Sequence, residues 1–170
     1  MNNENQIEVK ENVLAGVVGA FIFSLAGGVL WFVLYMIGFI ASISGLVGVI
    51  CAIKGYQVFS KKESTKGIVI ATVIAVFVIV VAWYFGIAYE IFDVHRYWLE
   101  TGEIDYTVTF FDAVGAVPFY LEDPEYTLAL LGDLGIGLVF CAFGAGSYVV
   151  NKIRNSRAKK LSRQKTEIDE

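Results

Sequence analysis

Long uncharged stretches alternate with short charged segments along this chain, and the clearest stretch is residues 67–89. It reads GIVIATVIAVFVIVVAWYFGIAY and carries no charge over 23 residues. A bilayer core about 30 Å thick needs about 20 apolar residues, because a helix rises about 1.5 Å per residue. This stretch is therefore long enough to cross a membrane as a single helix.

Residues 12–53 are also free of charge, over 42 residues. One helix of that length would exceed the bilayer core by about 30 Å. We therefore expect two spans, at about 13–34 and 37–58, joined by a tight hairpin near residues 35–38. A last apolar stretch predicts a fourth span at about 130–151. The fold class predicted is all-α, a polytopic membrane protein with a four-transmembrane-helix bundle.

The predicted membrane domain comprises residues 12–153. It has one segment on either side and contains one long loop. Residues 1–11 are polar, and we expect a disordered lead. Residues 154–170 form a basic tail. The loop at 90–125 joins the third and fourth spans, and it is too long to lack structure of its own. We expect this outer loop to be partly helical.

Local signals place helix ends in the outer loop. We expect the third helix to continue past the membrane until Gly102 stops it. Thr109 and Asp112 fit an N-cap with an acid at the third helical position. They predict a short helix in the membrane interface, broken around Pro118. A fourth helix is expected to start near Pro124, since proline favours the first helical position, and to run to about residue 153.

Two ionisable side chains are candidates for a role inside the membrane. Asp133 could pair with a donor, line a polar cavity or relay protons. We favour the simpler interpretation that it reaches the outer headgroup region. Lys54 could face the bundle interior, but we favour an ammonium group that extends to the inner membrane boundary.

The two signs of charge are segregated along the chain, although the formal net charge is only −4. Lysine and arginine accumulate in cytoplasmic loops of membrane proteins. Residues 54–66, which comprise the end of the second span and the loop after it, hold four lysines, Lys54, Lys61, Lys62 and Lys66. The tail and the two residues before it hold seven bases, whereas the outer loop holds nine acids and one arginine, Arg96. The seven bases are Lys152, Arg154, Arg157, Lys159, Lys160, Arg163 and Lys165. The pattern predicts that both termini are cytoplasmic.

Small residues recur every four positions in each span, which places them on one helix face. Small faces let helix backbones approach closely, which is how helices associate in lipid. We favour this packing role over a glycine-lined pore. The residues are Gly16, Ala20, Ser24 and Gly28; Ser44, Gly48 and Ala52; Gly67, Ala71 and Ala75; and Gly137, Cys141 and Ala145.

The low share of charged residues is typical of a membrane protein, because charges are excluded from the lipid-facing surface. Only 18% of the residues are charged, against about 25% in soluble domains. The basic tail, above all Lys152, Arg154, Arg157, Lys159 and Lys160, should attract anionic inner-leaflet lipid at about 1 kcal/mol per basic residue. Nucleic-acid binding is not favoured, because the tail lacks interleaved aromatic residues and a recognisable fold.

Motifs of catalysis are missing from the sequence. It has no glycine-rich phosphate loop, no nucleophile elbow, no His-Glu-x-x-His and no paired cysteine ligands. His95 is the single histidine, and its spacing from Glu90 and Asp93 is poor for a shared helix face. Cys51 and Cys141 fall at different expected depths, so we expect no disulfide. We predict no enzyme, no cofactor and no metal site.

Several stretches resemble a known group of proteins. They are ENVLAGVVGA, LWFVLYMIGFIASISGL, AIKGYQVF and TFFDAVGAVPFYLEDPE. Together they resemble small four-span membrane proteins of Gram-positive bacteria, a group for which no activity is established. The resemblance covers most of residues 11–150. It implies a bacterial plasma-membrane location and supplies no catalytic residue.

These observations favour a non-enzymatic accessory or interaction subunit of a larger membrane assembly. It would act through its packing faces and its outer loop, with a membrane-protein partner or a second copy of the chain. One alternative is a small oligomeric transporter or channel with Asp133 or Lys54 near the path. Another is an envelope stress or immunity-type membrane protein, for which no residue can be named.

Overall fold

The structure, a computed structural model, describes residues 11–37 and 43–168, and within 159–168 it describes the helix alone. These residues form five helices and no strand: α1 (Val13–Met36), α2 (Ile43–Ser60), α3 (Thr65–Thr101), α4 (Phe110–Tyr120) and α5 (Pro124–Ile168). All of them except α4 are long and apolar enough to cross a membrane. The all-helical class and the four candidate spans are confirmed, and the chain is a multi-pass membrane protein by this criterion.

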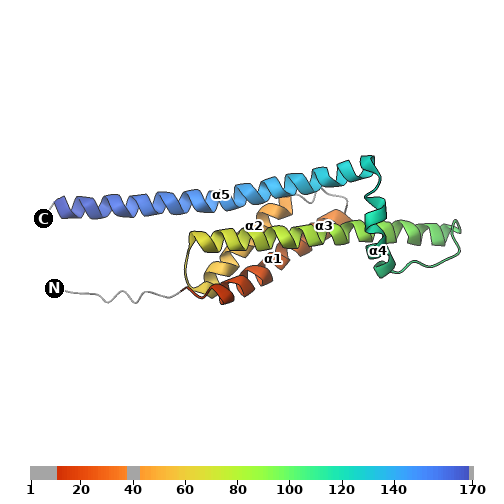
Figure 1. Ribbon diagram of the computed structural model, residues 1–170, viewed down its shortest axis with the longest axis horizontal. Helices are drawn as coiled ribbons and strands as arrows, with labels where there is room; N and C mark the ends of the chain where they lie inside the picture. Colours follow the sequence, from red (N-terminus) through yellow and green to blue (C-terminus); the bar gives the residue numbers. More distant parts are fainter. Residues whose placement is uncertain (1–10, 38–42, 169–170) are drawn as a thin grey trace.

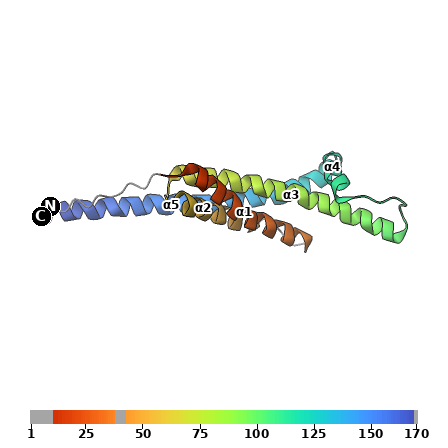
Figure 2. The same ribbon diagram turned by 90° about the horizontal axis from the view of Figure 1, so that it is seen from below.

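Helix α3 is the central element, and Figures 1 and 2 show the other helices arranged around it. Helices α1 and α2 form a hairpin that packs on α3, and α5 packs on α2 and α3. With 37 residues, α3 is about 55 Å long. It therefore projects beyond the α1–α2 hairpin, and α4 lies across this projecting part (Figure 1).

Some helix limits differ from the sequence-based expectation. The expected second span began at residue 37, and residues 38–42 lie outside the described part; the helix there is Ile43–Ser60. The expected basic tail is not separate from the last span, because α5 continues as one helix to Ile168. The expected lead at 1–11 also lies outside the described residues, except for Glu11.

Helices α1 and α2 touch through their backbones at two glycine pairs. A Cβ atom on Gly27 would lie 2.3 Å from the Gly48 Cα, and a Cβ atom on Gly55 would lie 2.3 Å from the Gly19 carbonyl oxygen. No side chain fits at either crossing. Close contact of this kind is the main source of helix association where lipid removes the hydrophobic driving force. The glycines therefore determine how these two helices cross.

The small residues predicted to pack are placed on the buried sides of their helices. All of them are buried except Ala145, which is half-buried. Helices α2 and α5 approach as closely as α1 and α2, because a Cβ atom on Gly45 would lie 2.4 Å from the Gly137 carbonyl oxygen. Cys141 adds a hydrogen bond from its thiol to the Gly45 carbonyl, at 3.2 Å. Cys51 and Cys141 are both free thiols.

Helix α4 begins at the predicted cap. The Thr109 side chain accepts a hydrogen bond from the Asp112 backbone N–H, and the Asp112 carboxylate accepts one from the Thr109 N–H. The Thr109 hydroxyl, which donates to Asp112 Oδ2 at 2.6 Å, and the Thr109 N–H together lower the pKa of Asp112 below its usual value. At the other end of the same loop, Asp123 accepts a hydrogen bond from the Glu125 N–H at 3.0 Å. Helix α5 therefore starts at Pro124, as predicted.

The expected break at Pro118 is wrong, because α4 continues through this residue to Tyr120. Proline has no N–H, so it cannot donate to the carbonyl four residues earlier, which belongs to Val114. The Tyr84 hydroxyl on α3 donates to that carbonyl instead, at 2.9 Å. A side chain from another helix thus replaces the missing backbone donor and attaches α4 to α3.

We expect Gly27→Ala to lower the stability of the bundle by about 1–3 kcal/mol, the usual effect of overpacking. The new methyl group would meet the Gly48 backbone, which cannot move aside. Gly115→Ala is the matched control, because its Cβ position on α4 is open. The measurement is thermal unfolding in a neutral detergent, followed by helical circular dichroism. Equal midpoints for the two variants would contradict the role assigned to the Gly27 crossing.

We expect Tyr84→Phe to destabilise α4 by about 1 kcal/mol, because the Val114 carbonyl would lose its donor. In a Pro118→Ala background the alanine N–H can donate to the Val114 carbonyl. Tyr84→Phe should therefore lower the free energy of unfolding by clearly less in that background. Unfolding free energies of the four proteins in this double-mutant cycle, with hydrogen exchange of the α4 amides, measure the coupling. An equal cost of Tyr84→Phe in both backgrounds would show that the hydroxyl does not replace the proline N–H.

Candidate functional site

A carboxylate joins three helices at the end of the bundle nearest α4. Glu90 directly follows the uncharged stretch of α3. Its Oε2 atom accepts hydrogen bonds from the Tyr35 hydroxyl of α1 at 2.5 Å and from the Tyr126 hydroxyl of α5 at 3.2 Å. We call Glu90, Tyr35 and Tyr126 the Glu90 cluster. Because it connects α1, α3 and α5, it determines how these helices lie at the α4 end.

A second carboxylate joins three parts of the chain at the opposite end of the bundle. Glu11, just before α1, accepts hydrogen bonds from the Tyr56 hydroxyl of α2 at 2.9 Å and from the Ser64 hydroxyl before α3. The Tyr56 ring fills the space beside Gly16 and Gly67, where a Cβ atom would lie 2.6 and 2.2 Å from ring atoms. The hydroxyl groups of Ser64 and Tyr56 hold the pKa of Glu11 below its ordinary value of 4.5.

The separation of the two clusters matches a bilayer. Ser64 and Glu90 are 26 residues apart along α3, which corresponds to about 39 Å of helix. A bilayer has a hydrocarbon core of about 30 Å and a total thickness of about 40–45 Å. The two carboxylate clusters are therefore spaced so that each lies near one boundary of the apolar layer.

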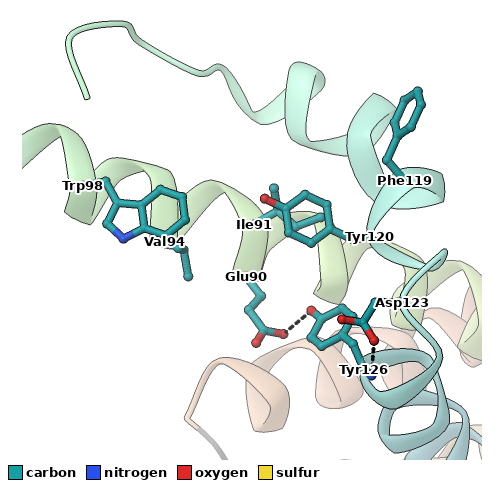
Figure 3. A pocket seen from close by; sticks show the side chains of 8 residues that line it. All are labelled: Glu90, Ile91, Val94, Trp98, Phe119, Tyr120, Asp123 and Tyr126. Carbon is teal, nitrogen blue, oxygen red and sulfur yellow. Dashed lines mark hydrogen bonds between the residues drawn. The ribbon is translucent and has the colours of Figure 1, made fainter. Parts of the chain in front are cut away.

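A cavity opens beside the Glu90 cluster, between the projecting part of α3, the end of α4 and the start of α5 (Figure 3). Its volume is about 440 Å³. Small-molecule sites usually have roughly 300–1,000 Å³. The lining is mainly aromatic and aliphatic with two carboxylates: Glu90, Ile91, Val94, Trp98, Phe119, Tyr120, Asp123 and Tyr126. We call this the α4-end cavity.

Both carboxylates of the α4-end cavity keep one oxygen free of hydrogen bonds from described residues. Glu90 receives both tyrosine hydroxyls on Oε2, and Asp123 receives the backbone N–H groups of Glu125 and Tyr126 on Oδ1. No lysine or arginine belongs to the lining. The nearest arginine in sequence, Arg96, pairs instead with Asp93 at 3.0 Å. The cavity is therefore apolar and negatively charged.

Helix α5 presents a second unusual surface, on the side opposite the bundle. Of the four candidate spans it has the smallest buried share. Its outward residues recur in steps of three or four, and all are exposed except half-buried Gly135. We call them the outer seam: Leu128, Gly132, Gly135, Val139, Ala142, Gly146, Val150 and Ile153. A groove runs along part of the seam beside Phe143.

The two ionisable candidates of the sequence occupy different surroundings. Asp133 is half-buried on α5. It lies seven residues after Tyr126 of the Glu90 cluster, which is about two helical turns along the same helix face. Lys54 is exposed on α2, and its ammonium lies 5.7 Å from the centre of the Tyr148 ring on α5.

The basic residues of α5 differ in their contacts. Lys152 is half-buried, and its ammonium donates to the Glu63 carbonyl at 2.8 Å, which ties α5 to the turn before α3. Arg154 and Arg157 are exposed, as lipid contact would require. The side chains of Lys159 and Lys160 lie outside the described part.

His95 makes contacts within its own helix, α3. Its Nδ1 atom lies 2.7 Å from the Ile91 carbonyl oxygen of its own helix, and its ring packs edge-on against Trp98. Within the described residues there is no group of three histidine, cysteine or acidic side chains that could hold a metal ion.

Sequence reasoning missed the Glu90 cluster, the Glu11 cluster and the α4-end cavity. One signal was available, because Glu11 and Glu90 directly flank the two longest uncharged stretches, residues 12–53 and 67–89. Their tyrosine partners could not be inferred in this way. Tyr35 is 55 residues from Glu90, and Tyr56 is 45 residues from Glu11.

We expect Glu11→Gln to lower the unfolding midpoint at about pH 7 and to lose this effect progressively as the pH falls below the ordinary glutamate value of 4.5. Because the pKa of Glu11 is lowered in the folded chain, its stabilisation is complete above the ordinary value. It is lost as the pH falls through the lowered pKa. Unfolding of both proteins in neutral detergent across this pH range is the measurement. A midpoint difference that is independent of pH would rule out a contribution from the charge of Glu11.

Comparison of the chain with protein-family models, with curated proteins and with solved structures found no match. We therefore infer the function from the geometry of the two carboxylate clusters, the α4-end cavity and the outer seam.

Proposed function

We propose that this protein is a non-enzymatic interaction subunit of a membrane assembly and that a transmembrane helix of a partner protein packs on its outer seam. The observation that carries the proposal is the open space above three seam glycines. A Cβ atom added to Gly132, Gly135 or Gly146 would meet nothing within 4 Å.

The same helix uses its other glycines inside the bundle. A Cβ atom on Gly144 would lie 2.5 Å from a Val49 methyl carbon, and Gly137 is in backbone contact with Gly45. A glycine in a helix interior costs about 1 kcal/mol relative to alanine. On the outer seam, no contact within the described part of a single chain offsets this loss of stability. Close approach of another helix, which small residues permit in lipid, would offset it.

The orientation and location we propose follow the charge pattern. The lysines around residues 61–66 and the basic part of α5 lie at one end of the bundle, and the acidic loop lies at the other. Since basic residues favour the cytoplasmic side, both termini would be cytoplasmic, and the exposed bases would contact anionic lipid. The resemblance to Gram-positive four-span proteins supports a bacterial plasma membrane.

A small oligomeric transporter is the second candidate, and the position of Asp133 favours it. This carboxylate is half-buried on α5, about two helical turns after Tyr126 of the Glu90 cluster, where it could take part in ion or proton movement. Within the described part of one chain, however, the buried polar side chains are Ser24, Ser44 and Ser60. A polar path would therefore need several copies, which could pack through the same seam. No particular residue supports a stress or immunity role.

We expect Gly146→Leu to remove the partner from the protein without loss of folding. Leucine would fill the open seam and raise helix propensity, so association should fall while stability does not. Ala129→Leu is the matched control, because Ala129 is also small and exposed but lies about a quarter-turn away from the seam. The measurement is affinity purification from the native membrane in mild detergent, with mass spectrometry and unfolding midpoints of all three proteins.

A stoichiometric second protein that is lost with Gly146→Leu and kept with Ala129→Leu would support an interaction subunit. A homo-oligomer with the same dependence on Gly146 would shift the function to the transporter, tested by liposome flux with Asp133→Asn. A protein that remains a single chain in every preparation would contradict both.

A further inference from the structure

The α4-end cavity has the chemistry of a site for an organic cation. Its walls are aromatic and aliphatic, from Trp98, Tyr120 and Tyr126 to Ile91 and Val94. The rings of Tyr120 and Tyr126 pack edge-on with centroids 6.4 Å apart. Aromatic faces attract ammonium and guanidinium groups by about 0.5–2 kcal/mol each, depending on how far they exclude water.

Two carboxylates provide the complementary charge at the same place. Glu90 is held by the hydroxyl groups of Tyr35 and Tyr126, and Asp123 is held by its capping bonds. Figure 3 shows both carboxylates bonded to Tyr126, Glu90 through the hydroxyl and Asp123 through the backbone N–H. Each keeps one oxygen that accepts no hydrogen bond from a described residue. Because both carboxylates are fixed by other contacts, a cation could bind without first ordering them, which lowers the entropic cost of binding.

The place of the cavity defines the rest of the ligand. Glu90 marks the end of the 23-residue uncharged stretch, so the cavity lies where the apolar layer meets water. A ligand here would carry its charge toward the carboxylates and an apolar body along Ile91, Val94 and Trp98. The volume of about 440 Å³ accommodates a small organic amine or the headgroup of a lipid.

We propose that the α4-end cavity binds an alkylammonium group attached to an apolar body, either as a free amphiphilic amine or as an aminolipid headgroup. This inference is independent of the outer seam, which lies on a different part of α5. It assigns a ligand-binding role to the outer loop and to Glu90.

Asp123→Asn is the sharpest variant for testing the proposal. Asparagine caps a helix as well as aspartate does, so α5 should still start at Pro124, but the charge is removed. The control is Glu122→Gln, which neutralises the neighbouring exposed acid that is not part of the lining. Tyr120→Leu tests the aromatic face while keeping an apolar side chain.

The measurement is isothermal titration calorimetry with benzyltrimethylammonium and full-length protein in a neutral sugar detergent. We expect saturable binding that falls about tenfold in Asp123→Asn, as for one charged contact, falls also in Tyr120→Leu, and is unchanged in Glu122→Gln. Benzylsulfonate, with the same ring and the opposite charge, should not bind. Unfolding midpoints of all variants check that the fold is kept.

A second arm separates the two sources of the ammonium group. Phosphatidylethanolamine or phosphatidylglycerol with matched acyl chains is added to the micelles before titration. Displacement by phosphatidylethanolamine alone identifies an aminolipid, and displacement by neither lipid identifies a free amine. Absence of benzyltrimethylammonium binding, equal binding of benzylsulfonate, or equal affinity of Asp123→Asn and Glu122→Gln would each overturn the proposal.

Discussion

Backbone contact between helices is the constraint on which the rest of this structure depends. In lipid, apolar side chains gain little from meeting each other, so helices associate where their backbones approach most closely. Helices α1 and α2 do so at Gly19–Gly55 and Gly27–Gly48, and α2 and α5 do so at Gly45–Gly137. These three crossings set the order of the helices around α3. They also determine which side of α5 is left facing outward.

Polar contacts then fix the two ends of the bundle. Glu11 and Glu90 each collect two hydroxyl groups from other elements. Hydrogen bonds to an ionised carboxylate are stronger than those between neutral groups. At the α4 end the arrangement is extended by Tyr84, which holds α4 through the carbonyl that Pro118 leaves without a donor. These contacts also form the α4-end cavity, because its walls come from α3, α4 and the start of α5, which the contacts join.

Helix α5 shows how one residue type serves two purposes. Gly144 lies against α2, where a Cβ atom would meet Val49, and the Gly137 carbonyl lies against Gly45 of α2. Gly132, Gly135 and Gly146 lie on the opposite side, where space is open. A helix that only faced lipid would lose nothing by carrying alanine at these three positions, and would gain helix propensity. The division of α5 into an inward and an outward small face links the fold to the proposed role in assembly.

The sequence by itself determined the number and type of the spans, the end of α3 at Gly102, the cap of α4 and the start of α5 at Pro124. Each depends on interactions within a few residues or on the length of an uncharged stretch, and both can be read locally. Only the tertiary structure decided that α4 passes through Pro118, that Glu90 meets Tyr35, and that the outer seam of α5 stays open. These features depend on contacts between residues that are far apart in the chain, and the pattern of hydrophobic positions carries no information about such partners.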